Sequence, residues 1–217
     1  KKAFMVSTLI DGFASFRNDF FGENSVFFSH LVERGQNPKT MVISCSDSRA
    51  DPSILFRTRP GELFVIRNVA NLVPPYQPDD QYHSTSAAVE FGVRDLSVEN
   101  IVILGHSCCG GVNALCAHAR GEVARDREFI TPWIKISLPA LETLRDNDPL
   151  FEDNKQAEQH SIMNSLDNLR TFPWLAEREA NGKLSLHGWW FDMDNGALWC
   201  YEPLKKCFSQ MIPSEQD

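Results

Sequence analysis

The sequence predicts an α/β fold: a central, mostly parallel β-sheet flanked by helices, with an N-terminal helical arm and a C-terminal β-hairpin. Three observations support this prediction. Short apolar runs that do not alternate with polar residues are typical of strands buried on both faces of a parallel sheet, and they occur at residues 40–44, 63–67 and 100–104. A helical pattern separates the second run from the third, which is the order strand, crossover helix, strand. A turn signal near the C-terminus separates two further strands.

The first element is an amphipathic helix in an N-terminal arm that spans residues 1–35. Its apolar side chains recur at helical spacing, at Met5, Leu9, Phe13, Phe16 and Phe20. We interpret it as a helix and not as a secretory signal, because the apolar stretch is short, meets Asp11 and is followed by no small-residue cleavage site. Two uses remain open for this helix, packing into the core or packing on a second subunit.

A crossover helix is expected between the second and third strands. Hydroxyl side chains at 84–86 offer N-caps, and Val89, Val93 and Leu96 recur at the spacing of a buried helix face. This helix makes the first half of the chain a strand, helix, strand unit.

The C-terminal half continues the same domain. A second helix is expected at about 112–120, and residues 121–180 are expected to be mostly helical. Strands at 184–192 and 197–201 are joined by the turn Asp194-Asn195-Gly196 as a hairpin added to the sheet. We predict one domain over residues 1–217, made of the arm 1–35, a core 36–120 that carries the candidate site, and the segment 121–217.

Composition excludes several classes of protein. The 217 residues carry a net charge of −8, and 42% are hydrophobic, which is ordinary for a globular protein and unlike a collagen-like or disordered chain. No apolar run is long enough to span a membrane, and no dense Lys/Arg patch indicates nucleic acid or anionic lipid as a partner. Six unevenly spaced cysteines are too few for a disulfide scaffold, so we expect thiols or metal ligands and a cytoplasmic location, with an organelle or microcompartment left open.

The chemistry-bearing residues follow the predicted strands. Cys45 comes after the first strand, and His106, Cys108 and Cys109 come after the third. Because the carboxyl ends of parallel strands meet at one edge of a sheet, Cys45, His106 and one of the two later cysteines should converge. Two thiolates and one imidazole suit zinc with one open position, although a buried Cys at a strand end is ordinarily a small apolar residue. The helix that opens at Gly110 favours a thiolate at Cys109.

A carboxylate and a guanidinium flank the first candidate ligand. Asp47 and Arg49 form a C-x-D-x-R pattern with Cys45. One interpretation is an incidental surface ion pair. The other is an ionised carboxylate that Arg49 holds beside a metal-bound water.

These motifs together resemble the β-class carbonic anhydrases. The resemblance rests on Cys45-Ser-Asp-Ser-Arg49, Arg67-Asn-Val-Ala-Asn71 and Gly105-His-Ser-Cys-Cys-Gly-Gly111 in this order, is densest over residues 36–113, and continues weakly over 186–192. It implies Cys45, His106 and Cys109 as ligands of one Zn²⁺ per chain, with Asp47 and Arg49 as the catalytic pair. Cys108 departs from the family's pattern, and we interpret it as an inert neighbour.

The resemblance extends to the plant-like subtype. Gln36, Phe64, Val69, Tyr82 and Gly110 match its substrate-binding positions. Another subtype carries a Trp and a Tyr for a second bicarbonate site, where this chain has Val42 and Phe191. The resemblance therefore implies an open zinc and an Asp47 paired with Arg49.

The implied function is the reversible hydration of CO2 to bicarbonate and a proton by zinc-bound hydroxide. Two thiolate ligands cancel the charge of the metal, so we expect activity to rise into alkaline pH. The implied partners are CO2 or bicarbonate and a second copy of the chain, in a homodimer or a higher even oligomer whose pocket is completed across the interface. Two alternatives are a hydrolase of carbonyl sulfide or carbon disulfide on the same scaffold, and a non-catalytic zinc-binding or thiol-redox protein.

Overall fold

The computed structural model describes residues 6–22, 26–122, 127–145 and 154–212, and it divides into two compact units. The first unit is Lys1–Asn37 and the second is Pro38–Asp217. The boundary lies two residues after the predicted end of the arm. Whether both units act as one domain stays a prediction.

The described part of the N-terminal unit, residues 6–22 and 26–37, forms two helices, α1 (Val6–Phe21) and α2 (Phe27–Arg34). The expected helix is therefore present, and Met5 lies outside the described residues. Aromatic rings hold the two helices together; the ring centroids of Phe21 and Phe28 are 4.7 Å apart and stacked. No described residue of either helix is buried, and Phe13 is 64% exposed.

A six-stranded sheet forms the centre of the second unit, in the order β2-β1-β3-β4-β5-β6. The first four strands in this order are parallel and the last two are antiparallel, which confirms the mostly parallel sheet. The bounds are β1 Thr40–Cys45, β2 Leu63–Asn68, β3 Asn100–His106, β4 Ser185–Asp192, β5 Ala197–Glu202 and β6 Cys207–Ile212. The antiparallel β4–β5 pair confirms the hairpin.

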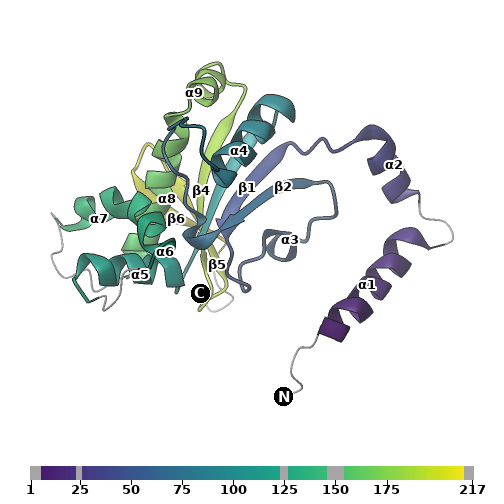
Figure 1. The fold of residues 1–217 in the computed structure, drawn as a ribbon, viewed down its shortest axis with the longest axis horizontal. Helices are drawn as coiled ribbons and strands as arrows, with labels where there is room; N and C mark the ends of the chain where they lie inside the picture. The colour runs from purple at the N-terminus through teal and green to yellow at the C-terminus, as the bar shows by residue number, and fades with distance from the viewer. Residues whose placement is uncertain (1–5, 23–25, 123–126, 146–153, 213–217) are drawn as a thin grey trace. The chain divides into compact units, whose positions relative to one another are not determined.

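Helices cover the two faces of this sheet unequally. The helical elements of this unit are α3 Pro52–Leu55, η1 Val69–Asn71, α4 Ser84–Glu90, η2 Phe91–Asp95, α5 Gly110–Ala119, α6 Ile130–Ile134, η3 Lys135–Ser137, α7 Leu138–Arg145, α8 Asn154–Arg170 and α9 Pro173–Ala180. One face packs Met41, Ile43 and Ile103 against α4, η2 and α8. The opposite face carries a smaller apolar cluster that includes Val42 and Leu104. Helix α8 contacts β3 and β4, and α5 and α7 gather beside it (Figure 1).

The structure departs from the sequence-based expectation at three elements. Strand β2 lies at the sheet edge and is only partly buried, so the expectation of burial on both faces holds for β1 and β3 but not for β2. The crossover helix ends as a π-helical turn at Phe91–Asp95. Strand β6 was not predicted. None of the helices in the described ranges combines the length and apolar character that crossing a bilayer requires.

Candidate metal centre

Three side chains converge where the central strands end. β1 ends at Cys45, the neighbouring β3 ends at His106, and Cys109 caps the start of α5. Their ligand atoms all lie within 4.8 Å of one another, and the two sulfurs are 3.9 Å apart. All three side chains are buried. The structure thus brings together the three residues that the sequence singled out as metal ligands.

His106 is oriented as a ligand would be. Its Nδ1 lies 2.8 Å from the Ser107 carbonyl, which can only accept, so Nδ1–H donates and Nε2 keeps its lone pair. Nε2 is buried and has no hydrogen-bond partner among the described residues. An unpaired buried nitrogen is costly, and a cation between Nε2 and the two sulfurs would satisfy it. The residues therefore fit a metal ion.

The two thiols behave as a coupled pair. The pKa of Cys45 is lowered, first because of its hydrogen bond with Cys109, and the backbone N–H groups of Ala70 and Asp47 also donate to its sulfur. The same hydrogen bond raises the pKa of Cys109. One proton leaves the pair readily and the second only with difficulty. A divalent cation compensates two adjacent thiolates, so this donor set suits zinc in particular.

Asp47 and Arg49 form a two-pronged ion pair beside the cluster. Arg49 Nε donates to Oδ1 at 3.0 Å and Nη2 donates to Oδ2 at 2.8 Å. The guanidinium holds the pKa of the Asp47 carboxyl well below its usual range. Arg49 Nη2 also donates to the Cys108 carbonyl at 3.3 Å. Asp47 is thus paired with Arg49, the arrangement implied by the resemblance, and does not join the candidate ligands.

The expected pocket residues divide into two groups. Val69 and Gly110 border the cluster, because η1 packs directly against the first turn of α5. Phe64 does not reach it: it lies four residues before the partner of Cys45 in the β1–β2 register, which is about 13 Å along a strand. Its ring packs instead against Phe91, at 6.0 Å between centroids, a contact that the sequence had not indicated.

One further expected residue, Tyr82, lies apart from the cluster. Tyr82 is fully exposed at the edge of a cavity of about 610 Å³ that none of the three candidate ligands lines. Gln36 belongs to the N-terminal unit. Within the second unit, the described residues therefore form the candidate metal cluster with Val69 and Gly110 beside it. The expected aromatic residues Phe64 and Tyr82 do not reach this cluster.

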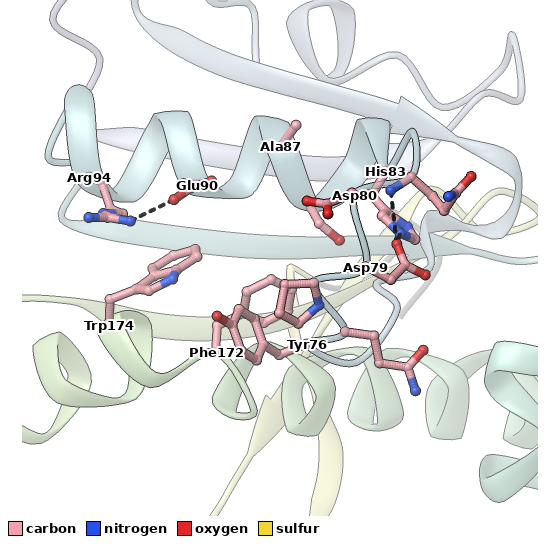
Figure 2. A pocket seen from close by; sticks show the side chains of 13 residues that line it. Tyr76, Asp79, Asp80, His83, Ala87, Glu90, Arg94, Phe172 and Trp174 are labelled. Atoms are coloured by element: carbon pink, nitrogen blue, oxygen red, sulfur yellow. Dashed lines mark hydrogen bonds and ion pairs between the residues drawn. The ribbon is translucent and has the colours of Figure 1, made fainter.

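Another cavity, of about 330 Å³, contains none of the candidate ligands. Figure 2 shows α4 on one side of it, with His83 and Asp79 at one end and the rings of Phe172 and Trp174 on the opposite side. His83 Nε2 lies 2.5 Å from Asp79 Oδ1, so these two groups are paired with each other.

Sequence reasoning missed one residue at the cluster. Glu158 of α8 is buried, and one of its oxygens accepts the backbone N–H of Cys109 at 2.9 Å. It lies 49 residues after Cys109 in a polar helix, so no local motif marked it.

Comparison with known proteins agrees with this geometry. The carbonic anhydrase family model matches residues 40–198. Beta carbonic anhydrase 3 of Arabidopsis thaliana is 37% identical over 200 residues, which cover 89% of this chain and 76% of that protein. The chain belongs to the β-class carbonic anhydrases. The resemblance inferred from the motifs is thereby confirmed.

Solved structures of β-carbonic anhydrases share the fold. The β-carbonic anhydrase CcaA is similar with a TM-score of 0.85 and 30% identity, over 95% of this chain and 93% of that one. A tetrameric β-carbonic anhydrase of Sordaria macrospora is similar with a TM-score of 0.70 and 27% identity, over 94% and 96% of the two chains.

Proposed function

We propose that this chain catalyses the reversible hydration of CO2 to bicarbonate and a proton, with one Zn²⁺ held by Cys45, His106 and Cys109. The observation that carries the proposal is the buried cluster with an unpaired His106 Nε2, beside the Asp47–Arg49 pair. A structural zinc takes four protein ligands, whereas three leave a position for water. When bound, zinc supplies the Lewis acidity that makes water a nucleophile near neutral pH.

Asp47 is proposed to orient the attacking water. Oδ1 accepts from both the backbone N–H and Nε of Arg49, whereas Oδ2 accepts only from Nη2 and retains a lone pair that can accept a further hydrogen bond. Arg49 keeps the carboxyl ionised, so Asp47 acts as an acceptor and not as a donor. A water that donates to Asp47 turns its lone pair toward the carbon of CO2.

The substrate side of the pocket is proposed to be small and apolar. Val69 offers methyl groups and Gly110 offers no side chain, and these suit a small uncharged molecule. Gln36 is proposed to donate a hydrogen bond to the bicarbonate oxygen that develops charge.

A second copy of the chain is proposed to complete the pocket, in a homodimer or a higher even oligomer. Phe64 lies too far along β2 to line its own chain's cluster. Helices α1 and α2 carry several aromatic residues, yet none of their described residues is buried. Exposed apolar clusters of this kind mark interaction surfaces. The acidic charge balance and the free thiols support a cytoplasmic location, with an organelle or microcompartment as the alternative.

Stopped-flow CO2 hydration with a pH indicator tests the proposal. Metal-stripped protein should be inactive, and one equivalent of zinc should restore activity. An Asp47→Asn variant that binds zinc equally well serves as the matched control, and it should hydrate CO2 more slowly. Zinc-loaded protein that releases sulfide from carbonyl sulfide or carbon disulfide, with no CO2 hydration at pH 7 or 9, would contradict the proposal.

A further inference from the structure

The carboxylate of Glu158 is a buried group that the reaction scheme above does not use. It is 3% exposed and sits on α8, which contacts β3, β4 and α5. Oε1 accepts the backbone N–H of Cys109 at 2.9 Å, and Oε2 accepts the indole N–H of Trp190 at 3.0 Å. One side chain thus ties a candidate metal ligand to the central sheet.

The peptide bond between Cys108 and Cys109 is held at both ends. Its carbonyl accepts from Arg49 Nη2 at 3.3 Å, and its N–H donates to Glu158. Cys108 has a φ of +57°, a left-handed conformation that is unfavourable for a non-glycine residue. Such a conformation persists when surrounding contacts fix it, and these two hydrogen bonds are such contacts.

Only a carboxylate of this length satisfies both donors. The two partners are N–H groups, so the side chain between them must present two acceptor oxygens. A glutamine presents one oxygen and one NH₂, and its NH₂ would face an N–H donor. An aspartate is one methylene too short to span the same donors from this backbone position.

A lysine, Lys155, lines the same cavity as the buried Glu158 carboxylate. Lys155 lies one turn earlier on α8, with Nζ 4.9 Å from the ring centroid of Trp190 and 4.3 Å from that of Trp199. Lys155, Glu158 and Trp190 line one cavity of about 390 Å³ that also includes Cys108. The Lys155 ammonium thus borders the same cavity as the buried carboxylate.

We propose that Glu158 is a positioning residue of the metal centre: it fixes the Cys108–Cys109 peptide, so that Cys109 Sγ faces Cys45 and the Cys108 carbonyl faces Arg49. The same peptide thereby links the metal ligand to the guanidinium that holds Asp47. This inference rests on the proposed metal site and deepens it.

The test replaces Glu158 with its isostere and follows the metal directly. Glu158→Gln and the matched control Asp167→Asn remove one charge from the same helix; Asp167 is 76% exposed and pairs with Arg170 on the surface. Each protein is loaded with Co²⁺ or Zn²⁺, and the visible spectrum of the cobalt form and the rate of zinc loss to a chelator are measured. We expect Glu158→Gln to shift the cobalt bands and to speed zinc loss about 10- to 100-fold, while the control matches the parent.

Each outcome bears on the inference. A Glu158→Gln protein with the parent's cobalt spectrum and zinc-loss rate overturns it, and so does an Asp167→Asn protein that changes equally. If Glu158→Gln does not fold, hydrogen exchange at the Cys109 amide of the zinc-free parent decides: slow exchange supports the clamp and fast exchange overturns it. A parent protein that shows cobalt–thiolate bands without CO2 hydration would defeat the proposed function and leave this inference standing.

Discussion

At the scale of single residues, the site depends on a contrast between paired and unpaired groups. Both carboxylate oxygens of Asp47 accept hydrogen bonds from Arg49, whereas Nε2 of His106 has no hydrogen-bond partner among the residues described. The ion pair keeps the Asp47 carboxylate ionised and fixes its orientation, and the unpaired Nε2 of His106 remains free to bind a metal ion. Substitutions in the Asp47–Arg49 pair should therefore lower the reaction rate, whereas substitutions among the candidate ligands should remove the metal.

Replacing Arg49 should reduce activity without removing the metal. Arg49→Gln deletes both prongs of the ion pair, and we expect kcat/KM to fall about 10- to 100-fold with the zinc content unchanged. Arg49→Lys should fall between this variant and the parent, because it keeps the charge but loses the two-pronged geometry. Steady-state kinetics with metal analysis on each variant checks this, and an unchanged Arg49→Gln rate would contradict it.

The same pair should protect the fold against acid. The folded pKa of Asp47 is below its unfolded value of about 3.9, so the pair stabilises the protein above that pH and loses its effect as pH falls through the folded pKa. Arg49→Gln should therefore unfold at a higher pH than the parent. Circular dichroism followed from pH 6 to pH 2 measures the two midpoints, and coincident midpoints would argue against the linkage.

Activity should rise with pH across the neutral range. Two thiolate ligands cancel the metal's charge, so bound water should ionise somewhat above pH 7. Asp47 remains ionised throughout because its pKa is lowered, and it therefore adds no acid limb. We expect kcat/KM to increase from pH 6 to pH 9 as a single ionisation; a flat profile would be inconsistent with a neutral centre.

Adjacent cysteines should differ sharply in importance. Cys109 Sγ is buried 3.9 Å from Cys45 Sγ, whereas Cys108 is exposed. Cys109→Ser should lose stoichiometric zinc and reduce activity about 100-fold or more, while Cys108→Ser should stay within about twofold of the parent. Zinc content and hydration rate are measured for both variants, and the reverse pattern would assign the ligand to Cys108.

At the scale of elements, burial explains which predictions succeeded. Strand β1 is buried over Met41–Cys45, and its sequence there is apolar except for Ser44, which makes it recognisable. Strand β6 carries Ser209 and Gln210 among apolar residues at an edge, and its pattern does not separate it from a loop. The ligand cluster could be predicted because parallel strands place their ends together. Glu158 could not, because its contact with Cys109 depends on how α8 packs.

Where η1 packs against α5, alanine in place of Gly111 should destabilise the fold, whereas alanine in place of Gly110 should not. A Cβ at Gly111 would lie 2.8 Å from Ala70 Cβ and 2.9 Å from Val69 Cγ1, whereas a Cβ at Gly110 meets nothing within 4 Å. Gly111→Ala should lower the free energy of unfolding by about 1–3 kcal/mol. Gly110→Ala is the matched control in the same helical turn and should be neutral or stabilising. Urea unfolding compares them, and equal midpoints would exclude this packing constraint.

At the scale of the whole molecule, the position of Phe64 matters for the proposed pocket. It lies about 13 Å along the strands from its own Cys45, beyond the reach of its ring. The proposed pocket, which contains both residues, would therefore be built from two chains. This arrangement can be tested without a structure of the oligomer.

Two variants with defects on opposite sides of such a pocket should rescue each other. Cys45→Ser removes a metal ligand and Phe64→Ala removes the apolar wall, so each homo-oligomer should be impaired. In a mixed dimer, the chain with Phe64→Ala keeps its metal site and receives an intact Phe64 from its partner, which restores one of the two pockets. Co-expression with two affinity tags isolates the mixed species, whose expected activity is about half that of the parent per dimer. Activity no higher than the mean of the two homo-oligomers would mean that each chain builds its pocket alone, because rescue requires the two defects to fall in the same composite site.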